Sequence, residues 1–319
     1  MTRLHWAKAG GITAIFLIGT LCNALAQPAA PDIPFAPLQD TALKDPDNPI
    51  KKFRVDFARV EHEFPLSRAD LNKITPENLM ALSQEQVDQI YGRLTAGPIP
   101  DGPFRGNLFF ARGDSASPGG ESLSTRLEEI LGGLKGRLAG SNIEFLETLG
   151  RSLWKGKVFN RDQRVLRNMI EDIAPLRHVI DDPSTLRTTT IPRTGFLGRF
   201  LPGNAVWLLF PAKLYCGQSL VDARRESVIV DYHYSDEIEG YRPSPDSLAG
   251  RGGLKIRDEI RMVRPGFYLG RAYANRMFLL NFTLFSSDLA EREAASFAAG
   301  KPIAEDCWPG EQVPKVAGR

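Results

Sequence analysis

The sequence predicts an α+β protein in which an antiparallel β-barrel, or a strongly curved sheet, follows a helical N-terminal segment and precedes a C-terminal helix. Residues 206–285 carry the first observation, because they contain consecutive strand patterns with little chain between them. Capped helical patterns occupy residues 75–94, and a final helical pattern covers 288–298. Short connections between successive strands favour antiparallel pairing.

The first 26 residues have the pattern of a secretory signal peptide. Arg3 and Lys8 precede an apolar run, and Ala24-Leu25-Ala26 is a typical cleavage site. The apolar run at 12–21 is shorter than the roughly 20 residues that span a bilayer. We therefore expect no transmembrane anchor after cleavage and a periplasmic or secreted location.

The charge of the mature chain excludes one class of partner. The full sequence has 40 basic and 38 acidic residues, and the signal segment contains two basic and no acidic ones, so 40 − 2 leaves 38 of each sign. A neutral chain lacks the basic surface that binds nucleic acid or an anionic membrane. We expect no nucleic-acid partner.

Four segments follow the signal peptide. Residues 27–50, rich in Pro, Ala and Asp, are expected to form an extended or disordered leader. The next three segments are a helical N-terminal segment (51–103), a β-barrel domain with helical insertions (104–300) and a C-terminal tail (301–319).

Helices are predicted from their start signals and from apolar spacing. Thr75 is a cap followed by proline at the first helical position. Ser83 and Gln86 have the spacing of a capping box that opens a second helix. Leucine and isoleucine at helical spacing predict further helices over 123–134 and 143–149.

Strands are predicted from runs of β-branched and aromatic residues between turn signals. Short strands are expected over 106–111 and 153–159, whereas 162–173 is expected to be a short helix or a turn-rich excursion. Tight turns at 264–266 and 274–276 join the last three strands into a meander. The five strands of the C-terminal half are expected over 206–216, 227–234, 254–263, 267–274 and 277–285.

Two cysteines, Cys216 and Cys307, remain after signal cleavage. In an oxidising compartment an even pair favours a disulfide over two separate buried thiols. The bridge would close a loop of about 90 residues and contribute up to about 4 kcal/mol in the chain-entropy model. It would also hold the C-terminal tail against the barrel.

Alternation along the strand 254–263 places one carboxylate on an apolar face. Asp258 shares that face with Ile256 and Ile260, and the opposite face carries Glu259 and Arg261, which we expect to be solvated. A buried charge without a partner costs several kcal/mol, so Asp258 requires a cation nearby.

In the next strand, Arg271 shares one face with Tyr273 and with large apolar residues. Two hypotheses follow. In one, Arg271 and Asp258 form an ion pair that fixes the strand register. In the other, Arg271 projects into a cavity and binds a ligand carboxylate or phosphate, while Asp258 orients it. Tyr273 and Tyr232 are candidate hydroxyl donors to the ligand, although strand tyrosines usually serve packing.

His233 and Asp231 are the candidate catalytic residues. His233 is the one histidine within the strand patterns of 206–285, and Asp231 lies two residues before it. A carboxylate can orient a histidine as a general base. A structural histidine is the alternative.

The sequence lacks the motifs that would indicate a metal or a cofactor. It contains no Cys-x-x-Cys or His-Glu-x-x-His, and its 4 histidines cannot supply a histidine-rich metal centre. It also lacks a P-loop and a dinucleotide fingerprint after any predicted strand. We expect no metal and no cofactor.

The strand meander, the strand Trp154-Lys155-Gly156-Lys157-Val158-Phe159 and the apolar interior resemble lipocalin-like (calycin-type) barrel proteins over residues 104–285. The Gly-x-Trp signature of lipocalins is absent, and Trp154-x-Gly156 reverses its order. The resemblance implies a lipocalin-like barrel with a cup for small apolar molecules. It implies no site residues, because no family motif matches position by position.

Three functions are compatible with these observations. The first is an exported protein that binds a small apolar, lipid-like molecule. One version of this hypothesis gives the molecule an acidic head group that contacts Arg271. The second is a metal-free acid/base enzyme of isomerase or dehydratase type, in which His233, Asp231 and a tyrosine converge. The third is an accessory protein whose partner is an exported enzyme.

Overall fold

The computed structural model describes residues 28–38, 55–112, 154–174, 180, 182–191 and 203–310. The predicted signal peptide and the predicted helices at 123–134 and 143–149 lie outside these residues. Residues 28–38 of the predicted leader carry no helix or strand. The domain boundaries expected from the sequence stay a prediction.

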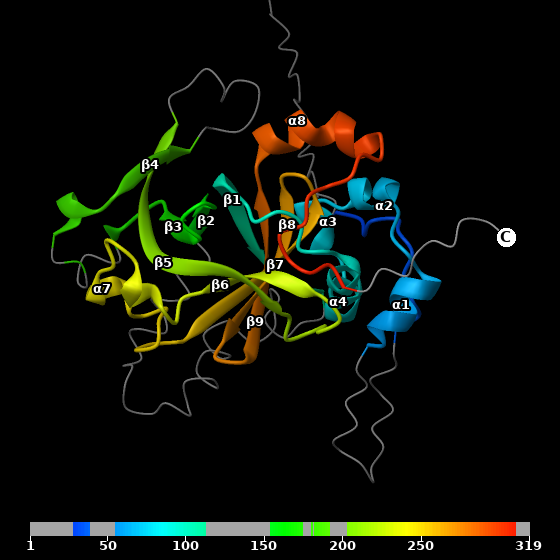
Figure 1. The fold of residues 1–319 in the computed structure, drawn as a ribbon, viewed down its shortest axis with the longest axis horizontal. Helices are drawn as coiled ribbons and strands as arrows, with labels where there is room; N and C mark the ends of the chain where they lie inside the picture. Colours follow the sequence, from blue (N-terminus) through cyan, green and yellow to red (C-terminus); the bar gives the residue numbers. More distant parts are fainter. Residues whose placement is uncertain are drawn as a thin grey trace, which may run out of the picture.

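Eight antiparallel strands close into a barrel, which confirms the predicted fold class (Figure 1). Around the ring they follow the order β5-β3-β2-β1-β9-β8-β7-β6, and β6 returns to β5. Their bounds are β1 (Gly102–Phe109), β2 (Trp154–Asn160), β3 (Val165–Ile170), β5 (Asn204–Gln218), β6 (Glu226–Asp231), β7 (Ile256–Arg264), β8 (Phe267–Ala274) and β9 (Met277–Phe285). A further short strand, β4 (Thr188–Ile191), pairs with β5 beside the ring.

The meander β7-β8-β9 has the turns that the sequence predicts. Gly266 has a φ of +76°, in the left-handed region that glycine adopts without strain, and a Cβ there would lie 2.6 Å from the backbone nitrogen of Ala290. Asn275 occupies the second turn with a φ of +59°. The strand β3 corrects one prediction, because 162–173 is neither a helix nor a turn-rich excursion. Its residues Val165–Ile170 pair with β2 and β5 and close the ring.

Six α-helices occur among the described residues. They are α1 (Phe57–Glu63), α2 (Arg68–Lys73), α3 (Pro76–Leu79), α4 (Gln84–Arg93), α7 (Pro243–Asp246) and α8 (Ser287–Ala298), with 3-10 turns at η3 (Pro183–Thr185) and η5 (Ser235–Glu237). The predicted cap at Thr75 and the predicted capping box of Ser83 and Gln86 are confirmed. No helix within the described ranges is long and apolar enough to cross a membrane.

Two apolar cores share the strands β7 and β8. The first lies in the barrel lumen, where Phe104 packs edge to face against Phe159 and Tyr268. The second lies between the outer wall and the N-terminal helices, where Ile90 of α4 and Leu269 of β8 belong to one cluster. Figure 1 shows α1–α4 together on one flank of the barrel. Every residue of β8 is consequently buried on one side or the other.

This second layer corrects the predicted solvated face of β7. Glu259 and Arg261 are both 0% exposed, because the outer wall of β7 lies under α4 and the loop after β5. Arg261 donates to the carbonyl oxygen of Tyr91 on α4 and to the hydroxyl of Ser227. Alternation predicted the two faces of the strand correctly, but solvent does not reach Glu259 or Arg261 and reaches only Arg257 on the polar face of β7.

The two ends of the barrel differ. At one end, here called the tail end, the chain makes short turns between β2 and β3 and between β7 and β8, and residues 303–308 cross it. At the other, the loop end, three long connections leave the barrel, at 110–153, 171–203 and 232–255. Lipocalin-like barrels are cups with one closed end, and the closed eight-stranded antiparallel ring is compatible with that architecture.

Candidate functional site

An ion pair spans the lumen of the barrel. Lys157 projects from β2 and Asp258 from β7, and these strands lie four positions apart around the ring in either direction. The Lys157 Nζ lies 2.9 Å from Asp258 Oδ2, and the two side chains are 3% and 5% exposed. The pair therefore joins opposite walls at the centre of the barrel.

Polar neighbours complete the hydrogen bonds of this pair. Lys157 Nζ donates to the hydroxyl of Tyr232 at 2.6 Å and to Oδ1 of Asn168 at 2.9 Å. Asn168 Nδ2 contacts the same hydroxyl at 2.9 Å and donates to the carbonyl of Phe210. Asn168 lies on β3, directly opposite Lys157 on β2. Tyr232 directly follows β6, the strand next to β7, which carries Asp258. We call Lys157, Asp258, Tyr232 and Asn168 the lumen cluster.

Aromatic rings enclose the ammonium group. Lys157 Nζ lies 5.4 Å from the ring centroid of Trp154, 5.3 Å from that of Tyr232 and 5.4 Å from that of Phe282. Trp154 also donates from its indole nitrogen to Asn168 Oδ1 at 2.8 Å. Aromatic faces stabilise a desolvated cation through their quadrupoles.

Burial and pairing shift the ionisation of the cluster in different ways. Burial opposes the charge on Lys157, but Asp258 and Tyr232 outweigh it, so the pKa of Lys157 lies above its ordinary value. Burial raises the pKa of Asp258, against the attraction of Lys157. Burial also raises the pKa of Tyr232 to about 12, so its hydroxyl stays protonated at neutral pH.

Apolar residues of the lumen core lie on both sides of the lumen cluster, and some at the loop end, such as Ile170 and Ala274, are also fully buried. On the tail-end side, Phe104, Phe159 and Ile260 are at most 2% exposed. On the loop-end side, five apolar residues that pack against the lumen core are only partly buried. These residues, the rim, are Leu108, Phe110, Trp154, Trp207 and Ile256.

Arg271 lies outside the lumen, so the hypothesis in which Arg271 forms an ion pair with Asp258 is wrong. In the register of β7 and β8, Arg271 is opposite Glu259, and Asp258 is opposite Ala272. Arg271 forms an ion pair with Asp88 of α4 and donates from Nε to the hydroxyl of Tyr273 at 2.9 Å. Arg271 and Tyr273 thus connect the barrel wall to the N-terminal helices.

The ionisation of Arg271 follows from this position. Burial opposes its charge, but Asp88 and Tyr273 more than offset this, so the pKa of Arg271 lies above its ordinary value. Burial also raises the pKa of Tyr273. Ligand contact by Arg271 or Tyr273 stays a prediction.

Of the candidate catalytic residues, Asp231 is the last residue of β6 and His233 lies in the turn that follows, and no hydrogen bond between the imidazole and Asp231 occurs among the described residues. Asp231 accepts a hydrogen bond from the hydroxyl of Tyr215 at 2.6 Å and from the backbone N–H of His233 at 2.8 Å. The imidazole of His233 packs edge-on against Tyr234, with ring centroids 4.9 Å apart. The geometry places a tyrosine next to Asp231 but directs the histidine ring elsewhere.

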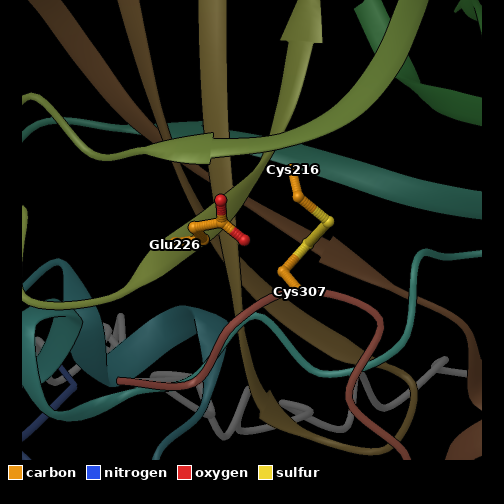
Figure 2. A group of neighbouring side chains, drawn as sticks. All are labelled: Cys216, Glu226 and Cys307. Atoms are coloured by element: carbon orange, nitrogen blue, oxygen red, sulfur yellow. A yellow bond between two sulfur atoms is a disulfide. The ribbon is translucent and has the colours of Figure 1, made fainter. Parts of the chain in front are cut away.

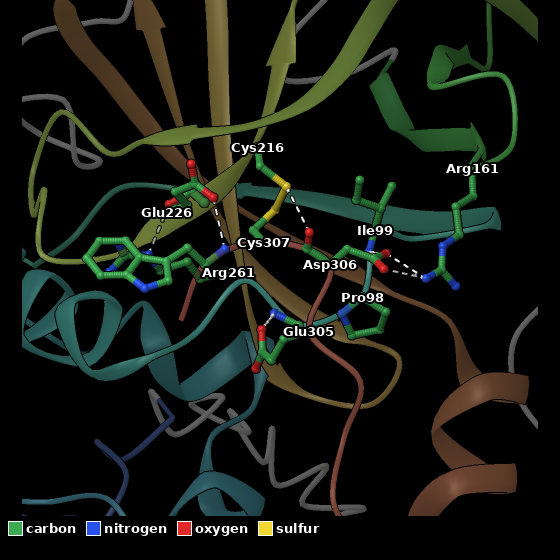
Figure 3. Close-up of a disulfide and its surroundings, with 12 residues drawn as sticks. Pro98, Ile99, Arg161, Cys216, Glu226, Arg261, Glu305, Asp306 and Cys307 are labelled. Atoms are coloured by element: carbon green, nitrogen blue, oxygen red, sulfur yellow. Dashed lines mark hydrogen bonds and ion pairs between the residues drawn. A yellow bond between two sulfur atoms is a disulfide. The ribbon is translucent and has the colours of Figure 1, made fainter. Parts of the chain in front are cut away.

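The predicted disulfide is present. Cys216 of β5 and Cys307 of the tail are bridged, with Cα atoms 5.3 Å apart (Figure 3). Polar contacts hold the same tail segment on both sides of the bridge. Asp306 accepts from the backbone N–H of Ile99 at 2.8 Å, and Trp308 donates from its backbone to Glu226 at 2.9 Å.

Sequence reasoning found Asp258 and Tyr232 but missed Lys157 and Asn168. A partial signal for Lys157 was available, because alternation places it on one strand face with Phe159, although Lys155 falls on the same face. Asn168 could not be found in this way, since its segment was not predicted to be a strand.

The comparisons with known proteins name no family. No family model matches the chain, and no curated protein matches it. A solved structure titled "Crystal structure of protein from Thermomonospora curvata" is similar over 65% of this chain and 89% of that chain, with 17% identity and a TM-score of 0.30. A similarity at that TM-score supports no inference about function.

Proposed function

We propose that this protein is exported and binds a small apolar molecule with a polar head group in the loop-end half of its barrel. The lumen cluster receives the head group, and the rim contacts the apolar part. The N-terminal signal pattern and the Cys216–Cys307 bridge support export, because disulfides persist in oxidising compartments.

The observation that carries the proposal is the buried Lys157–Asp258 pair. Burying two charges costs several kcal/mol per ion, and well-packed apolar residues of similar volume are often as stabilising or more so. A pair that is 3% and 5% exposed at the centre of an apolar lumen therefore supports a role in recognition. The neighbouring Tyr232 hydroxyl adds a neutral donor and acceptor.

An acidic head group fits this chemistry. A carboxylic acid can enter the lumen in its neutral form and pass its proton to Asp258, whose pKa is raised by burial. The ligand carboxylate then pairs with Lys157 while the protonated Asp258 donates a hydrogen bond. The net charge of the buried site stays unchanged, which avoids the cost of adding a charge to the interior.

The test is a binding titration with a medium-chain fatty acid, the corresponding alcohol and the methyl ester, followed by tryptophan fluorescence. We expect the acid to bind best and K157M to weaken its binding by at least about tenfold, which is 1.4 kcal/mol. R271M is the matched control, because it removes a buried cation outside the lumen and should leave the affinity within about twofold of the parent protein.

Two results would overturn the proposal. One is that none of the three probes binds the protein after it has been stripped of co-purifying small molecules. The other is that K157M, shown to be folded by circular dichroism, binds the acid as tightly as the parent protein.

A further inference from the structure

Three potential metal ligands meet beside the tail end of the barrel. One ligand atom each from Cys216, Glu226 and Cys307 lies within 4.8 Å of the other two (Figure 2). The residues come from β5, β6 and the tail, so no spacing motif in the sequence announces them. Oxidised as a disulfide, the two sulfurs are poor metal ligands, because metals bind the thiolate.

We propose that, when the disulfide is reduced, these residues bind one Zn²⁺ through the two thiolates and the Glu226 carboxylate, with water as the fourth ligand. Sulfur with a single carboxylate oxygen suits zinc, which accepts both ligand types in a tetrahedral arrangement. The disulfide and the metal are two mutually exclusive states of one site.

The movement required is small. Zinc bonds of about 2.3 Å to sulfur and about 2.0 Å to oxygen place tetrahedral ligands roughly 3.5–3.8 Å apart. The two sulfurs, bonded to each other in the oxidised state, must separate to that ligand–ligand distance. The carboxylate oxygen, within 4.8 Å of them, must approach by at most about 1.3 Å. Side-chain rotations supply shifts of this size without moving the backbone.

The surroundings orient the ligands. The backbone N–H of Trp308 donates to Glu226 Oε2 at 2.9 Å, which orients the carboxylate. Cys216 Sγ lies 3.3 Å from the carbonyl oxygen of Asp306 (Figure 3), a contact that becomes a hydrogen bond only when the sulfur carries a proton. Cys307 is buried, whereas Cys216 and Glu226 are partly exposed and give the ion a path from solvent.

The chemistry balances with a dithiol as the reductant. Two thiol groups of the dithiol transfer two electrons and two protons to the disulfide, which yields two cysteine thiols and an oxidised dithiol. Zn²⁺ binding then releases the two thiol protons. In both states the tail segment stays tied to β5, covalently in one and through the metal in the other.

The experiment uses the full mature chain. It is reduced with a phosphine, freed of reductant without oxygen, and titrated with Zn²⁺ against a chromophoric chelator. Co²⁺ serves as the spectroscopic probe of thiolate ligation. The variants are E226Q, which keeps a side-chain acceptor for Trp308, C307S, and E305Q as the control. Glu305 is a tail carboxylate that accepts from the N–H of Gly97 and is outside the cluster.

We expect one Zn²⁺ per reduced chain, none in the oxidised chain, and a sulfur-to-cobalt charge-transfer band in the reduced parent protein. C307S should show the charge-transfer band at reduced intensity. E226Q should weaken Zn²⁺ binding at least about tenfold, while E305Q should bind Zn²⁺ like the parent protein. Equal Zn²⁺ binding by E226Q and the parent protein overturns the proposal, whether the reduced chain is folded or not. Glu226 lies beside the two cysteines only in the folded barrel, so equal binding would mean that it is not a zinc ligand there. Failure of the reduced parent protein to compete with the chelator overturns it as well.

Discussion

Replacing Asp258 with Asn removes the negative partner of Lys157 at the centre of the barrel. The ammonium group then remains buried at 3% exposure with the Tyr232 hydroxyl and the Asn168 amide oxygen as acceptors but with no countercharge among the described residues within ion-pair distance. Hydrogen bonds from neutral groups satisfy its protons and do not neutralise its charge.

The expected loss of stability is about 3–5 kcal/mol, the range for removing one partner of a buried ion pair. For a chain of this size that corresponds to a fall in melting temperature on the order of 10 °C. The loss should be partly recovered in K157M/D258N, because the double variant contains no uncompensated charge. The two single variants and the double variant form a thermodynamic cycle whose coupling term isolates the pair.

The assay is urea unfolding of the oxidised protein at neutral pH, followed by far-ultraviolet circular dichroism. Comparable slopes for all four proteins are required before their midpoints are compared. A loss below about 1 kcal/mol for D258N would refute the reasoning, since a loss that small is typical of an exposed ion pair. A double variant less stable than D258N would refute it too.

Three further predictions concern residues outside that cycle or conditions outside neutral pH. The phenol of Tyr232 has a raised pKa of about 12, so its contribution to the free energy of unfolding is present below pH 10 and is lost as the pH rises toward 12. The loss should be about 2–3 kcal/mol. In urea titrations at alkaline pH, the stability difference between the parent protein and Y232F should therefore shrink over that interval. R271M should leave Asp88 without its buried partner. Amide hydrogen exchange should then become faster in α4 and change little in β2. An equal change in the exchange rates of α4 and β2 would contradict the assigned position of Arg271. C216S/C307S should lower the free energy of unfolding by about 4 kcal/mol, because the bridge closes a loop with a sequence separation of 91; unchanged urea midpoints would show that the tail is held by its polar contacts alone.

The local patterns predicted the strands of the C-terminal half well. The bounds of β8 and β9 agree with the predicted strands at 267–274 and 277–285, because alternation and turn residues such as Gly266 act within a few residues of each other. The capping box at Ser83 is local in the same sense. The segment around Asn168 was mispredicted, since its identity as a strand depends on pairing with β2 and β5, which are distant in the chain.

The candidate site was predicted in part for a related reason. Alternation correctly grouped Arg271 with Tyr273, and Asp258 with Ile260. It could not tell which face of a strand borders the lumen when both faces are buried, as they are in β8. Sequence reasoning therefore placed the cation of Arg271 inside the barrel, where the structure has Lys157.

The sequence by itself determined the class of fold, the meander and the helix caps, because each depends on residues close together in the chain. It also shows two cysteines beyond the predicted signal peptide. Only the tertiary structure decided that Lys157 and Asp258 meet across the lumen and that Arg271 meets Asp88 under α4. Charge pairing depends on which walls a closed ring brings face to face, and ring closure is a property of all eight strands together.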